Sequence, residues 1–151
     1  MKKIWNLIFS TRLMSVLIVL FAVAMAVATF IENDYGTQTA KALIYNAWWF
    51  ELIMILLTLN FIGNIFRYNL LRKEKWPVLL FHIAFIVILL GAFITRYFGY
   101  EGLMPIREGS TSNVILSDIT YVTATVDNGK EQKVFEKEVL FGALSNNHFK
   151  M

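Results

Sequence analysis

The sequence predicts an α-helical membrane protein with three transmembrane helices, followed by the start of an exported β-rich domain. Three apolar runs, at residues 13–31, 48–66 and 76–95, each approach the roughly 20 residues that a helix needs to cross a bilayer core. Apolar residues make up 57% of the chain, against roughly 45–50% in soluble globular proteins. This excess lies in the first two thirds, so we divide the chain into a membrane domain, 1–98, and a more polar segment, 99–151.

The first apolar run is expected to be a retained helix. Residues 13–31 contain no ionisable side chain, and the run is longer than the about 7–15 apolar residues of a signal peptide. Because two further runs follow it, we interpret it as the first of three spans.

The second run begins with Trp48 and Trp49, a pair typical of aromatic anchoring at the lipid headgroups. Glu51 lies just inside the run and is expected to face the outer interface. Asn60 and Asn64 are one helical turn apart, and we interpret them as residues that hydrogen-bond between helices.

The third run contains His82, and an ionisable residue inside a span is by default a candidate functional residue. Pro77 suits the first helical turn, and a helix that starts at Trp76 places His82 about 9 Å along its axis. Its neighbours at helical spacing are apolar: Val78, Leu79, Phe85, Ile86 and Leu89.

Two interpretations of His82 remain open on spacing alone. Its neutral imidazole on an apolar surface suits an axial ligand of haem iron, or a proton relay, and Lys73 and Lys75 lie where haem propionates would meet the membrane surface. The structural alternative is a hydrogen bond to Ser15, Thr58, Asn60 or Asn64. The other histidine, His148, is in the C-terminal segment, so a bis-histidine haem site needs a second ligand from elsewhere.

The segment after residue 98 predicts β structure. Gly99, Pro105 and Gly109 indicate irregular connections, whereas 119–126 is rich in β-branched residues that nearly alternate. Asn128-Gly129 follows, which indicates a type I′ hairpin turn, with residues 133–141 as the return strand. Because a lone hairpin is marginal in water, we expect a truncated domain and a chain that is part of a longer protein.

The distribution of charge predicts the orientation. Seven basic residues precede the first span or lie between the second and third, while loop 32–47 contains a single one, Lys41. Since Lys and Arg gather on the cytoplasmic side, we expect a cytoplasmic N-terminus and a periplasmic C-terminal segment. The seven are Lys2, Lys3, Arg12, Arg67, Arg72, Lys73 and Lys75.

Composition excludes several classes of function. The chain has no cysteine, which removes disulfides, thiolate nucleophiles and Cys-ligated metals from consideration. Its net charge of +3 comes without a nucleic-acid-binding motif, so we expect the lipid bilayer, and no nucleic acid, as its surroundings.

Three stretches resemble the ResB/CcsB family of system II cytochrome c biogenesis proteins. The most specific is GYEGLMPIREGSTSN at residues 99–113, which follows the third apolar run. The others are ATFIENDYGTQTAKALIYNAWWFELIMILLTLNFIGNI at 28–65 and DNGKEQKVFEKEVLF at 127–141.

The resemblance implies a haem-handling function in the cytoplasmic (inner) membrane. Family members work with, or are fused to, a CcsA-like membrane protein, and the complex moves haem outward and attaches it to exported apocytochrome c. The histidine matching the family's proposed axial ligand is His82, so His82 would hold the iron of transiently bound haem. The chain alone would not catalyse the attachment, because the external haem-presenting segment and the second histidine belong to the CcsA part.

Two alternatives to haem delivery remain. One is a membrane anchor that carries an exported β domain for sensing or scaffolding, without haem and with His82 in a structural role. The other is a small b-type cytochrome or proton-relay subunit, which the lack of a second intramembrane histidine disfavours.

Overall fold

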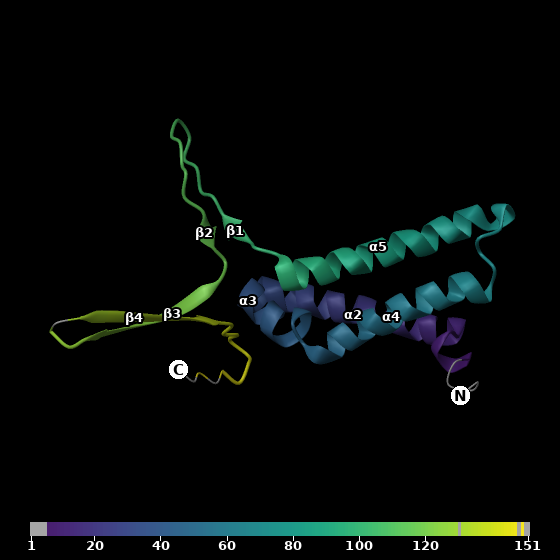
Figure 1. Cartoon of the computed structure of the whole chain (residues 1–151), viewed down its shortest axis with the longest axis horizontal. Coiled ribbons are helices and arrows are strands. Elements are labelled where there is room, and N and C mark those ends of the chain that lie inside the picture. Colours follow the sequence, from purple (N-terminus) through teal and green to yellow (C-terminus); the bar gives the residue numbers. More distant parts are fainter. Residues whose placement is uncertain (1–5, 130, 148, 150–151) are drawn as a thin grey trace.

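The computed structural model describes residues 6–129, 131–147 and 149. Three long helices are followed by two short antiparallel sheets (Figure 1). The helical elements are α2 (Thr11–Tyr35), α3 (Thr37–Ala40), the π-helix η1 (Lys41–Tyr45), α4 (Trp48–Arg67), the 3₁₀-helix η2 (Lys73–Lys75) and α5 (Trp76–Phe98). The strands are β1 (Gly102–Leu103), β2 (Leu116–Ser117), β3 (Thr120–Asp127) and β4 (Gln132–Val139).

The predicted fold class is confirmed. The long helices α2, α4 and α5 contain 25, 20 and 23 residues, and a helix of about 20 residues measures about 30 Å, the thickness of a bilayer core. All three are apolar enough to cross a membrane. Since every backbone group in a helix is satisfied within the segment, helices are the form in which such runs can lie in lipid.

Local sequence determines where these helices begin and end. The Ser10 hydroxyl caps α2 by accepting from the Arg12 backbone N–H at 3.2 Å. Gly36, with φ of 81°, ends the same helix in a conformation that favours glycine. Pro77 lies in the first turn of α5, where its missing N–H costs no helical hydrogen bond.

Helix α4 lies between α2 and α5 and packs against both (Figure 1). Its buried apolar residues recur at helical spacing, at Phe50, Met54, Leu57 and Phe61. These residues join the buried side chains of α2 and α5 in one core cluster. The central helix therefore positions the other two.

Most of the remaining helix surface is apolar and exposed, as expected for side chains that face lipid tails. Trp48 and Trp76 lie exposed at the first residues of α4 and α5, where amphipathic rings meet the headgroups. Exposed apolar residues within the spans include Val19, Val23, Phe30, Leu80, Val87 and Ile88.

The loop between α2 and α4 is ordered as α3 and η1. In η1 the Asn46 N–H donates to the Lys41 carbonyl at 2.9 Å, a spacing of five residues. Such π-helical turns are rare and occur often at functional sites. We call this end of the helices, where α3, η1 and the strands gather (Figure 1), the β end.

The C-terminal hairpin is present, but its turn differs from the prediction. Strands β3 and β4 pair with Asp127 opposite Gln132, and beyond this pair the Asn128 N–H donates to the Glu131 carbonyl at 3.3 Å, so Asn128 flanks the turn instead of being one of its two central residues. Gly129 has φ of 79°, and Asn128 is not among the described residues with positive φ. The reason is local: the Asn128 side chain also accepts from the Glu131 N–H at 2.8 Å, which holds Asn128 opposite Glu131.

The segment predicted as irregular forms a second hairpin, which we call the arm (residues 102–117). Strands β1 and β2 pair through only two residues each, and the chain between them projects away from the helices (Figure 1). Neither hairpin covers the other to make a core. The sheets thus depend on the membrane domain for their placement.

Replacing Asn60 tests the polar contact between α4 and the start of the chain. Asn60 is fully buried and donates to the Ile8 and Ser10 carbonyls. Asn60→Leu is expected to lower the free energy of unfolding in detergent by about 1 kcal/mol, a typical value for interhelical hydrogen bonds. Thr58→Val is the matched control, because among the described residues that hydroxyl bonds only to Met54 of its own helix. Equal losses in both variants would contradict this assignment.

Candidate functional site

His82 lies in the second turn of α5 with its ring turned toward α4. The side chain is buried, with a residue exposure of 8%. Its ring meets Phe61 of α4 edge-on, with centroids 5.4 Å apart and planes at 86°. The structure therefore places the imidazole at the interface of two spans.

One hydrogen bond sets the tautomer of this imidazole. His82 Nδ1 lies 2.9 Å from the Val78 carbonyl oxygen, four residues earlier. Because a carbonyl can only accept, Nδ1 carries the proton, and in the neutral ring Nε2 then keeps its lone pair. Histidines that bind metals commonly donate their other ring N–H in this way.

The surroundings of His82 are aromatic and apolar. Phe61 stacks on Phe85 with ring centroids 5.1 Å apart. The ring centroid of Phe81 lies 4.7 Å from that of Phe85 and 6.1 Å from that of His82. Phe81 is exposed while Phe61 is fully buried, so the cluster continues from the helix interface to the outer surface of α5. A flat apolar ligand is compatible with such walls.

The polar partners that sequence analysis offered for His82 make other hydrogen bonds. Ser15 and Thr58 donate to carbonyls of their own helices. Asn64 donates to Asn60 at 2.7 Å, and Asn60 binds the chain before α2. Within the part of the chain that the structure describes, none of these four is bonded to His82. The Val78 carbonyl takes their place.

Asn60 and Asn64 act as interhelical residues, as predicted. Both are buried, and Asn64 also lies 3.6 Å from the Met14 sulfur of α2. The Asn64 Oδ1 is a buried oxygen without a partner among the described residues. The pair thus connects α4 to α2 on a different side from His82.

A second polar cluster closes the β end of the α4–α5 interface. Arg96 donates to Glu51 at 3.2 Å and to the Tyr45 and Asn46 carbonyls at 2.8 and 3.0 Å, and Tyr97 donates to Glu51 at 2.5 Å. The sequence predicts that Glu51 faces the outer membrane interface, but it gives no signal for the partners of Glu51, which lie 45 and 46 residues later.

An apolar groove of about 230 Å³ lies beneath this cluster. The groove lies on the same face of α5 as His82. Its lining residues Leu89, Phe93 and Arg96 come 7, 11 and 14 residues after His82, and these spacings return to one face of a helix. Pockets for drug-sized ligands measure roughly 300–1,000 Å³, so this groove is smaller than a typical pocket of that kind. Its walls are Glu51, Met54, Ile55, Thr58, Leu59, Leu89, Leu90, Phe93 and Arg96.

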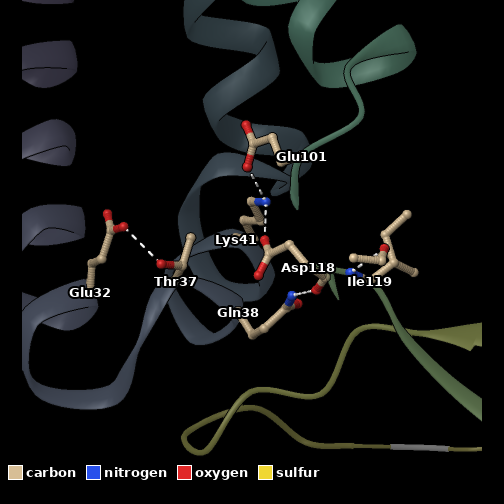
Figure 2. Close-up of polar contacts among 8 residues, drawn as sticks. Glu32, Thr37, Gln38, Lys41, Glu101, Asp118 and Ile119 are labelled. Carbon is tan, nitrogen blue, oxygen red and sulfur yellow. Dashed lines mark hydrogen bonds and ion pairs between the residues drawn. The ribbon is translucent and has the colours of Figure 1, made fainter. Parts of the chain in front are cut away.

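A third cluster joins the loop at the β end to the arm (Figure 2). Lys41 Nζ lies 2.7 Å from carboxylate oxygens of both Glu101 and Asp118. Gln38 donates to the Asp118 carbonyl. The sequence indicates a role for Lys41 only in the orientation of the chain, because Lys41 and Glu101 are 60 residues apart and no local pattern joins them.

The charges in this cluster shift one another's ionisation. The hydrogen bond from Lys41 lowers the pKa of Asp118 and outweighs burial, which acts in the opposite direction. Burial alone would lower the pKa of Lys41, but the hydrogen bonds and charges of Asp118 and Glu101 together raise it. The ion pairs are therefore favoured across the whole neutral range.

The remaining predicted residues lie apart from His82 or outside the described part. Lys75 donates to the Tyr68 carbonyl at 2.6 Å, and Lys73 makes no hydrogen bond or ion pair within the described residues. His148 is outside the described residues. No group of three or more acidic, histidine or cysteine ligands occurs in the described chain, so His82 is a single candidate ligand.

Comparison with known proteins identifies relatives of this chain. Residues 72–150 match the ResB-like family. The chain is also 45% identical over 127 residues to Protein NrfI of Wolinella succinogenes. That alignment covers 83% of this chain and 14% of the relative, so the chain spans a small fraction of the length of the protein that it matches.

Acid is expected to release the arm. The pKa of Asp118 is lowered in the folded protein. The stabilisation that its ion pair with Lys41 gives to the base of the arm is therefore complete above the unfolded pKa of about 3.9, and it is lost as the pH falls through the folded pKa. A partly exposed pair contributes about 0–1 kcal/mol, so the arm should loosen without unfolding the helices. A spin label at Thr111→Cys should gain mobility below about pH 3.9. In Asp118→Asn the same spin label should already be mobile at neutral pH. An equally large rise in mobility on acidification of that variant would contradict the assignment to Asp118.

Proposed function

This chain belongs to the ResB-like family of cytochrome c biogenesis proteins, and on that premise we propose that it carries haem across the cytoplasmic membrane in a system II cytochrome c synthetase. The observation that carries the proposal is the buried His82, whose Nδ1–H donates to the Val78 carbonyl and leaves Nε2 for iron. Haem is the cargo here. Its covalent attachment to apocytochrome c is assigned to the complex and not to this chain alone.

His82 would act as one axial ligand of the transported haem. The hydrogen bond to the Val78 carbonyl holds the imidazole on the helix backbone, and in the neutral ring it leaves the Nε2 lone pair as the donor that would bind iron. Phe81 and Phe85 supply an apolar aromatic wall of the kind that a porphyrin face contacts, and the buried Phe61 supports it from behind. Lys73, about two turns before His82, is positioned to meet a propionate at the membrane surface.

A CcsA-like membrane protein, fused or separate, would complete the site. Iron with two axial ligands needs a donor besides His82, and the described residues of this chain contain no other histidine. The groove along α4 and α5 supplies one wall toward the β end, and the partner would supply the other. This arrangement gives the cargo a continuous apolar face from His82 outward.

The protein would span the inner membrane with its N-terminus in the cytoplasm and its β end in the periplasm, where apocytochrome c is met. The basic residues near η2 and the loop with Lys41 at the opposite end support this orientation. Haem then enters near His82 and leaves near the strands.

Cysteine labelling tests the orientation, because the chain contains no native cysteine. In intact cells with a permeable outer membrane, a membrane-impermeant maleimide should label Thr111→Cys and should leave Glu74→Cys unlabelled until the inner membrane is broken. Both residues are exposed, so access depends on the side of the membrane. The reverse pattern would contradict the proposed direction of transport.

The absorption spectrum of the purified complex tests the function. The natural protein with its CcsA-like partner should show a Soret band, and His82→Ala should lose most of it because an axial ligand is missing. Leu80→Ala is the matched control and should keep the band, since Leu80 is an exposed apolar residue of the same helix outside the aromatic wall.

Two results would contradict the proposal in different ways. Equal haem in wild type and His82→Ala would return His82 to a structural role. No haem in any preparation would favour the second candidate function, a membrane anchor for an exported β domain. The exposed hairpins that extend from the helices are the observation favouring that alternative.

A further inference from the structure

Lys41 holds both ends of the arm at once. Glu101 immediately precedes β1, and Asp118 immediately follows β2. Lys41 Nζ contacts a carboxylate oxygen of each at 2.7 Å (Figure 2). The Asp118 N–H donates to the Glu101 carbonyl at 3.1 Å, so the two ends are also joined to each other.

The residue that holds the arm is itself fixed to the membrane domain. Lys41 is the first residue of η1, and its carbonyl accepts from Asn46. At the end of the same π-helix, Arg96 of α5 donates to the Tyr45 and Asn46 carbonyls. A chain of contacts therefore runs from α5 through η1 to the base of the arm.

Within the described residues, the arm has few other contacts to set its direction. Its two strands share two residue pairs, and Gln38 supplies one further hydrogen bond at its base. Its apolar side chains are exposed rather than packed on the helices; they are Leu103, Met104, Ile106, Val114, Ile115 and Leu116. The direction in which the arm projects thus depends on its base.

We propose that Lys41 is a positioning residue that fixes the direction of the arm on the membrane domain, and that cytochrome c formation depends on this direction. The dependence of cytochrome c formation on this direction rests on the proposed function. Without the ammonium group, Glu101 and Asp118 would face each other as like charges at a point that Lys41 now neutralises. Because partly exposed ion pairs contribute little to folding, the loss should appear in orientation and not in helix stability.

The test uses the full natural protein with its haem-handling partner, in lipid nanodiscs and in cells. Spin labels at Asn33→Cys and Thr111→Cys report the distance from the end of α2 to the arm, and both positions are exposed. Lys41→Met should broaden a narrow distance distribution. The exchange of charges in Lys41→Asp with Asp118→Lys should restore it, since the cation would again lie between two carboxylates. Lys133→Met, which removes an exposed cation from β4, is the control and should change nothing.

Covalent haem on exported cytochrome c is measured in the same strains. Lys41→Met should lower its yield by about tenfold, the scale of effects that misplacement of reacting groups produces, and the charge exchange should recover it. The Soret band at His82 should remain in every Lys41 variant, which distinguishes a misplaced arm from lost haem binding.

Three outcomes would overturn the proposal. An unchanged distance distribution in Lys41→Met would show that Lys41 does not set the direction of the arm. A broadened distribution with normal cytochrome c yield would show that the direction does not matter. A charge exchange that restores neither readout would make the effect one of general damage. If the wild type itself formed no covalent haem, the proposed function would fail, and the distance measurement would still decide the role of Lys41.

Discussion

The contact of Phe61 with α5 is the interaction on which the rest of the membrane domain depends. Phe61 is fully buried, stacks on Phe85 and meets the edge of His82. One residue earlier on the same helix, Asn60 binds the carbonyls before α2. Helix α4 thereby presents an aromatic face to α5 and a polar one to the start of the chain. The candidate ligand is held against a scaffold that is itself fixed on both sides.

Besides that contact, a series of polar interactions connects the membrane spans to the strands. Arg96 and Glu51 connect α5 to α4 at the β end, and Arg96 also binds the end of η1. Lys41, at the other end of η1, then binds the base of the arm. Polar groups dominate here because this end lies where water can reach the chain, whereas packing of apolar side chains dominates around Phe61.

How far the sequence predicts this structure follows from the range of each interaction. Apolar runs and Pro77 act locally, and they predict the three helices and place His82 on an apolar face. The partners of Lys41 and Arg96 lie 45 to 77 residues away, so no spacing rule finds them. The turn after β3 lies later in the chain than the predicted Asn128-Gly129 turn, because Asn128 bonds to Glu131 and so flanks the turn. The tautomer of His82 requires the ring orientation, which a sequence does not contain.

The most direct test of the account is ¹⁵N NMR of histidine-labelled protein in lipid, with its partner, before and after addition of haem. The partner is left unlabelled, and the signals of His82 are assigned as those that disappear in His82→Gln and remain in His148→Gln. Without haem, at a pH where the ring is neutral, we expect a protonated Nδ1 and an unprotonated Nε2. Haem should then shift or broaden the Nε2 signal. A proton on Nε2 before haem, or an unchanged Nε2 signal after haem has bound, would contradict the assignment of His82 as the ligand.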